Sequence, residues 1–158
     1  MRRLSAVEAI IAGGAAAGAC DITYAIVFSR VRSGVAPSRV LQSVASGVLG
    51  AAAYSGGWPT ALLGLALHFV NALIIAAIFY VAARNIPALT TRAATWGLAY
   101  GLGVYWFMLL VVIPLSAVPP RPFPAPIVVI TGIVVHMLGV GLPIALMAKN
   151  SLQGAIQR

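Results

Sequence analysis

The sequence is nearly empty of acidic residues, and charged residues of either sign are scarce. Its 158 residues contain only two acids, Glu8 and Asp21, against ten lysines and arginines, and 8% of all residues are charged. A water-soluble domain has about 25% charged residues, so this chain has too few to cover a water-facing surface. The bases are scattered in small groups between apolar runs. This distribution argues against a nucleic-acid partner and is typical of membrane proteins, whose bases contact anionic lipid head groups.

Cysteine and the common catalytic motifs are missing too. The single cysteine, Cys20, allows no disulfide within the chain and no cluster of thiolate metal ligands. The sequence has no Gly-x-Ser-x-Gly, no His-Glu-x-x-His and no phosphate-binding glycine-rich loop, which are motifs of hydrolases and nucleotide-binding enzymes. We therefore expect a protein that is not an enzyme.

Four apolar segments are long enough to cross a lipid bilayer, which takes a helix of about 20 residues. They are residues 6–28, 59–83, 93–117 and 126–148, and 61% of the whole chain is hydrophobic. A proline-rich stretch (AVPPRPFPAP) stops the third segment. The sequence predicts an all-α integral membrane four-helix bundle that forms a single membrane domain over residues 1–158.

The first segment imitates a cleavable signal peptide. Two arginines precede an apolar stretch, and small residues stand directly before Cys20. However, Glu8 interrupts that stretch, and the hydrophobic sequence continues through residues 21–28 (DITYAIVF). These two features favour a retained transmembrane helix over a cleaved signal.

Between the first two spans, residues 38–54 have the periodicity of an amphipathic helix, with Pro37 at its start. The apolar face comprises Val40, Leu41, Val44, Ala45, Val48, Leu49 and Ala52, and the polar face comprises Arg39, Gln42, Ser43, Ser46, Gly47 and Gly50. This segment is too short and too polar to span the bilayer. We expect an interfacial helix or a re-entrant one that enters the membrane partway.

The basic residues predict an orientation. With four spans, the two termini and the loop of residues 84–92 share one side and carry six bases, against four on the opposite side. Cytoplasmic loops carry an excess of Lys and Arg. The sequence therefore predicts that both termini lie in the cytoplasm.

The few polar residues inside the spans fall at similar depths. At a rise of 1.5 Å per residue, counted from the side of the amphipathic helix, Asp21 lies about 10 Å deep, His68 about 12 Å, His136 about 15 Å and Tyr105 about 18 Å. Asn71 follows His68 by one helical turn. Because ionisable residues inside a membrane are costly, they mark candidate functional sites. We therefore predict one ligand-binding or proton-relay cluster of these five residues.

Small residues line the faces that carry these polar side chains. Gly-x-x-x-His occurs at Gly64 and again at Gly132, and each of the other two spans carries Gly-x-x-x-Gly. The glycines of the four stripes are Gly14, Gly18, Gly64, Gly97, Gly101, Gly132 and Gly139. Such stripes allow helix backbones to approach closely. Their recurrence suggests two parallel halves, residues 1–83 and 93–148.

Three interpretations of the cluster stay open. In the first, the polar residues are structural and form interhelical hydrogen bonds that contribute roughly 0.6–2 kcal/mol each. In the second, they relay protons or bind a transported solute, a role in which intramembrane Asp and His are common. The third is a metallo-cofactor site in which His68 and His136 ligate haem iron or a transition metal. In that case Gly64, Gly132 and Gly139 would leave room for a flat ring.

Several stretches resemble a family of small uncharacterised four-span bacterial inner-membrane proteins. They are VAPSRVLQSVASGVLG, ALLGLALHF, VVIPLSA and HMLGVGLPIALMAK. The resemblance implies a multi-pass protein of the bacterial inner membrane and transfers no catalytic residue. We expect a binding, transport-like or accessory subunit that works as a homo-oligomer or within a larger membrane complex.

Overall fold

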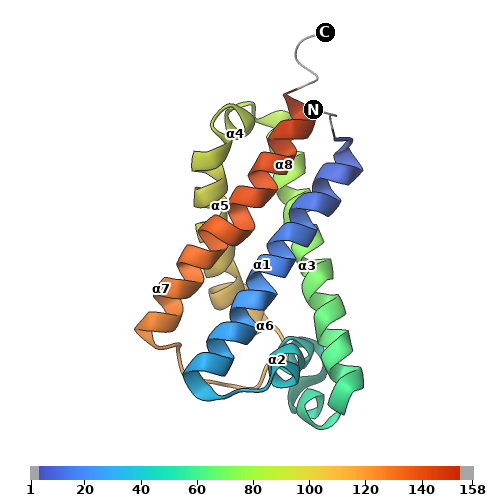
Figure 1. Cartoon of the computed structure of the whole chain (residues 1–158), viewed down its shortest axis with the longest axis vertical. Helices are drawn as coiled ribbons and strands as arrows, with labels where there is room; N and C mark the ends of the chain where they lie inside the picture. Colours follow the sequence, from blue (N-terminus) through green and yellow to red (C-terminus); the bar gives the residue numbers. More distant parts are fainter. Residues whose placement is uncertain (1–3, 154–158) are drawn as a thin grey trace.

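The chain is an all-α membrane-spanning bundle, as the sequence predicts. The computed structural model describes residues 4–153, which contain no strand. Four helical segments are long and apolar enough to cross a membrane: α1 (Ala6–Ser33), α3 (Gly57–Asn85), and the composite spans Ala93–Leu115 and Pro126–Leu152 (Figure 1). The starts of α1 and α3 follow the prediction to within two residues, and both helices run further than predicted.

Three shorter elements lie at the ends of the bundle. Helix α2 (Pro37–Leu49) and the 3₁₀ turn η1 (Gly50–Ser55) lie at the opposite end from the two termini, and α4 (Ala88–Thr91) lies near the termini (Figure 1). The connection after the third span has no regular structure and is tied to α2 by a hydrogen bond from Ala117 N–H to the Gly47 carbonyl (3.0 Å). This bond links the two halves of the chain at that end.

Helix α1 has well-formed ends. Ser5 and Glu8 make a reciprocal capping box, in which the Ser5 N–H donates to Glu8 Oε2 (2.8 Å) and the Glu8 N–H donates to Ser5 Oγ (3.2 Å). At the other end Gly34 adopts a left-handed conformation (φ 68°), which glycine reaches without steric cost. Arg30 and Arg32 lie in the last turn, where their positive charges interact favourably with the negative end of the helix dipole. The interactions at the C-terminal end stabilise the last turn, and the helix ends five residues beyond the predicted end.

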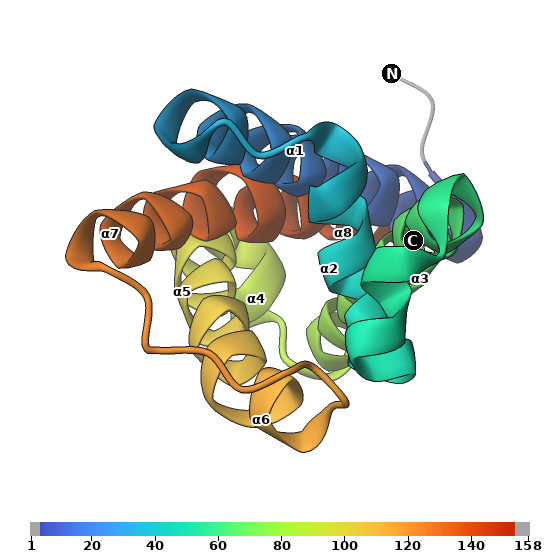
Figure 2. The same cartoon turned by 90° about the horizontal axis from the view of Figure 1, so that it is seen from below.

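Helix α2 is amphipathic, as predicted, and part of its polar face packs against the protein. Gln42 and Ser46, from the predicted polar face, are buried against the protein, whereas Val48 and Leu49 from the apolar face are 65% and 41% exposed. Gln42 Nε2 donates to the carbonyl of Gly57 (2.9 Å), at the start of α3. The helix lies across the end of the bundle beside α3 (Figure 2). Its polar residues satisfy backbone groups of the protein, and two of its apolar residues face outward.

The close helix approach predicted from the small-residue stripes is confirmed. A Cβ on Gly14 or Gly18 of α1 would collide with Leu73 or Phe69 of α3. A Cβ on Gly97 of the third span would lie 2.8 Å from the Cβ of Ala145 in the fourth. The first and third spans therefore each use a Gly-x-x-x-Gly pair to pack against the span that follows.

The third and fourth spans each contain a π-helical turn that the sequence analysis did not predict. The third consists of α5 (Ala93–Phe107), η2 (Met108–Val112) and α6 (Ile113–Leu115), and the fourth of α7 (Pro126–Val135), η3 (His136–Gly141) and α8 (Leu142–Leu152). In both, a proline follows the π turn by two residues, Pro114 in one and Pro143 in the other. Proline lacks an N–H and clashes with the carbonyl four residues before it. The wider turn relieves this clash inside an otherwise continuous helix.

Candidate functional site

The centre of the candidate site is a contact between the two halves of the chain. Asp21 Oδ1, on α1, lies 3.7 Å from Nδ1 of His136, the first residue of η3. Their side chains are 25% and 16% exposed, respectively. Within the described part of the chain, the His136 ring is the only polar partner of the Asp21 carboxylate. The contact is an ion pair only when the imidazole is protonated.

His136 is oriented by two further groups. Its Nδ1 lies 3.0 Å from the Gly132 carbonyl, to which an Nδ1–H donates. The ring of Tyr105, from α5, meets the imidazole edge to face with centroids 5.2 Å apart. Tyr105 packs over Gly132, where a Cβ would lie 2.6 Å from the tyrosine ring. The glycine therefore creates the space that brings Tyr105 to His136.

A pair of hydroxyl groups that was not predicted from the sequence lies about one helical turn from this contact. Tyr24, three residues after Asp21 on α1, has its hydroxyl 2.6 Å from that of Thr131, on α7. The Thr131 hydroxyl donates to the Ile127 carbonyl (2.6 Å), so the Tyr24 hydroxyl donates to Thr131. Tyr24 also lines an open, largely apolar hollow of about 640 Å³ between α1 and the fourth span. The three-residue spacing places Asp21 and Tyr24 on the same side of a helix, and this spacing could have identified Tyr24 from the sequence.

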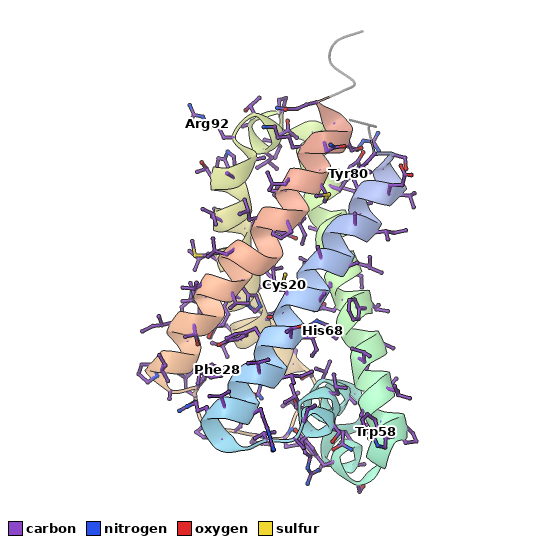
Figure 3. The ribbon with its side chains drawn as sticks, viewed as in Figure 1. Cys20, Phe28, Trp58, His68, Tyr80 and Arg92 are labelled. Carbon is purple, nitrogen blue, oxygen red and sulfur yellow. The ribbon has the colours of Figure 1, made fainter. Side chains whose placement is uncertain are left out.

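His68 lies near this centre but contacts a backbone carbonyl. Its Nε2 is 2.9 Å from the Gly18 carbonyl oxygen, so a proton on Nε2 is donated to that oxygen. Gly18 lies one turn before Asp21 on α1. His68 therefore connects α3 to α1 midway along the bundle (Figure 3).

Asn71 makes a different connection. Its Nδ2 donates to the Met108 sulfur at 3.6 Å, and a thioether is a weak acceptor. Met108 is the first residue of η2, as His136 is of η3. Among the five predicted residues, Asp21, His136 and Tyr105 therefore form one chain of contacts, while His68 and Asn71 make separate interhelical bonds.

The space beside the three glycines of the haem interpretation is filled by protein atoms. The glycines expected to leave room for a flat ring, Gly64, Gly132 and Gly139, are covered by the Leu41 carbonyl, the Tyr105 ring and Cys20, respectively. That expectation was wrong, because small residues here admit protein groups. Residues 4–153 also contain no group of three or more His, Cys, Asp or Glu side chains that could hold a metal ion. A ligand role for His68 and His136 stays a prediction.

An absorption spectrum and a metal analysis of the purified protein test that role. If His68 and His136 ligate haem, the protein shows a Soret band that His68→Ala and His136→Ala each abolish. Tyr80→Phe, remote from His68 (Figure 3) and hydrogen-bonded to Ser151 near the end of the fourth span, would leave the band unchanged. From the filled space beside the glycines we expect a colourless protein with no stoichiometric metal. A histidine-dependent band would contradict this expectation.

Comparisons of the chain with protein-family models, with curated proteins and with solved structures find no match. The predicted membership of a bacterial inner-membrane family therefore stays a prediction. Roles for residues rest on the geometry of this chain alone.

Proposed function

We propose that the protein is a small multi-pass protein of the bacterial inner membrane with a transport-like role, in which Asp21 and His136 bind a proton. The observation that carries this proposal is the 3.7 Å contact between these two titratable side chains, from opposite halves of the chain, within apolar spans. When the imidazole is neutral, an ionised Asp21 carries a negative charge in a low-dielectric region and has only a neutral partner. Burying a charge in this way costs free energy. Uptake of one proton by His136 converts the pair to an ion pair.

The backbone around the pair supports this role. His136 begins η3, and π-helical turns are rare and frequently occur at functional sites. Tyr24, three residues after Asp21 on α1, hydrogen-bonds to Thr131 and lines the open hollow. Hydroxyl groups both donate and accept hydrogen bonds, so this pair adds a polar group to α1 one turn from Asp21.

Proton flux into proteoliposomes tests the proposal. The purified chain is reconstituted with an internal pH-sensitive dye, and a pH step is applied outside. We expect dye acidification faster than in protein-free vesicles, with Asp21→Asn and His136→Gln each returning the rate to the protein-free level. Asp21→Asn keeps the size of the side chain and removes the carboxylate, so a loss of flux is assigned to that group.

His68→Gln is the matched control for His136→Gln. It replaces the other intramembrane histidine, whose partner is a backbone carbonyl. We expect the free energy of unfolding to fall by roughly 0.6–2 kcal/mol, the range of one interhelical hydrogen bond, while the proton flux is retained. If Asp21→Asn and His136→Gln also change only the thermal stability, the contact is structural and the proposal fails.

We also propose that both termini lie in the cytoplasm. The three segments on that side carry six of the ten bases, which follows the positive-inside tendency. Homo-oligomerisation is part of the same proposal, since a bundle of four helices is small for a transport pathway.

A further inference from the structure

A second hollow lies at the membrane end that carries α2, away from Asp21 and His136. It has a volume of about 620 Å³ and is bounded by the end of α1, the start of α2 and Tyr54 of η1. Arg39, Ser29 and Ser43 supply its polar groups, and Val35 and Val40 part of its apolar wall. It therefore combines a cation and hydroxyl groups with an apolar surface.

Arg39 is held in one orientation with part of its guanidinium unused. Its Nη1 donates to the Tyr54 carbonyl (2.7 Å) and lies 3.5 Å from Gln42 Oε1, and the guanidinium stacks over the Tyr54 ring at 5.2 Å. Its Nε and Nη2 make no hydrogen bond to any described residue. Two adjacent N–H groups of a guanidinium match two oxygens of a carboxylate or phosphate. The fixed side chain thus offers a preformed edge to an oxyanion.

The surroundings favour an anion as well. The described residues at this end include four arginines, Arg30, Arg32, Arg39 and Arg121. Neither acid of the chain lies there, because Glu8 is in the first turn of α1 and Asp21 is in the middle of that helix. The Ser29 hydroxyl, which makes no hydrogen bond to another described residue, is a further donor. Positive charge here is therefore not neutralised by the described part of the chain.

We propose that this hollow binds the phosphate group of one anionic phospholipid, with Arg39 as its principal ligand and Ser29 as a second donor. A lipid is favoured over free phosphate because the site lies at the end of a membrane-spanning bundle and has the apolar side chains of Val35 and Val40 in its wall. These side chains suit the glycerol and first methylene groups of a lipid. The site is independent of proton binding at Asp21 and His136.

Native mass spectrometry of the full-length protein, titrated with dioleoyl-phosphatidylglycerol, tests the proposal. We expect one retained lipid per chain, and weaker retention of dioleoyl-phosphatidylcholine, which has the same acyl chains. Arg39→Lys keeps the charge and loses the two-point contact, so we expect the phosphatidylglycerol affinity to fall about tenfold. Ser29→Ala should lower it by a smaller factor, about threefold.

Arg121→Lys is the matched control, an identical change at the same membrane end but outside the hollow. We expect it to leave the affinity unchanged. Equal losses in Arg39→Lys and Arg121→Lys would overturn the proposal in favour of diffuse attraction, and equal binding of the two lipids would overturn it in favour of association through the acyl chains alone. Displacement of the lipid by millimolar inorganic phosphate would assign the site to a free anion instead. If Arg39→Lys fails to fold, the Ser29→Ala titration decides alone, and an unchanged affinity there rejects the site.

Discussion

Replacing Gly101 by alanine is expected to destabilise the bundle by about 3 kcal/mol, at the upper end of the usual cost of overpacking, and to abolish proton flux. A Cβ at this position would overlap the carbonyl oxygen of His136 and lie 2.7 Å from its carbonyl carbon. Backbone atoms cannot rotate away as a side chain can. Relief therefore requires a shift of the helix that carries His136, which disturbs its contact with Asp21.

Gly103→Ala is the control for this prediction. It introduces the same methyl group two residues along the same helix, at an exposed position with open space around it. Stability of both variants is measured by denaturant titration in mixed micelles, and flux in proteoliposomes. We expect Gly103→Ala to behave like the unchanged protein or to be slightly more stable, since alanine favours helix over glycine. Equal behaviour of the two variants would show that α5 and η3 are not in close contact.

Gly64→Ala is expected to displace α2 from the end of the bundle. The added Cβ would overlap the Leu41 carbonyl oxygen and lie 2.8 Å from its carbonyl carbon and 3.1 Å from the Ala45 nitrogen. We expect a loss of stability of about 2–3 kcal/mol, concentrated in α2, because α2 is the shorter element and is free to move away from the long α3.

Hydrogen exchange of the α2 backbone amides measures this displacement. Protection of residues 37–49 should fall in Gly64→Ala, while that of α1 and α3 is largely kept. Gly47→Ala serves as the control, since its Cβ would make only an ordinary 3.9 Å contact with Ser116. Unchanged protection of α2 in Gly64→Ala would contradict the close packing of these two helices.

The spans were predictable because their signal lies in composition. Long runs of apolar residues need no knowledge of partners to be recognised as membrane-crossing. The faces of α2 were not predictable in the same way. Periodicity identified the helix, but only the fold shows that the Gly57 carbonyl needs a donor, which Gln42 supplies. Burial of a polar residue follows from an unsatisfied backbone group, and that group has no signature in the sequence.

The depth of the candidate site residues in the membrane was predictable from the sequence, but the direction of their side chains was not. Counting residues along each helix brought Asp21 and His136 to similar depths, and they lie 3.7 Å apart. The same count placed His68 with them, yet its partner is the Gly18 carbonyl. Depth follows from the rise per residue, whereas the direction of a side chain depends on the rotation of its helix. Backbone acceptors, present at every position, add partners that no residue pattern identifies.

The π-helical turn η3 changes the direction in which the later side chains of the fourth span point. Ile144 follows His136 by eight positions, which in a regular α-helix points the two side chains in directions about 80° apart. A one-residue expansion turns the later part of the helix by about 100°, which brings both directions close together. Accordingly, His136 faces Asp21 and Tyr105, and Ile144, 2% exposed, is buried in the same bundle. A deletion of one residue between them would leave Ile144 seven positions after His136, only about 20° away in a regular α-helix, so the wide turn would be lost while the buried face of the span is kept.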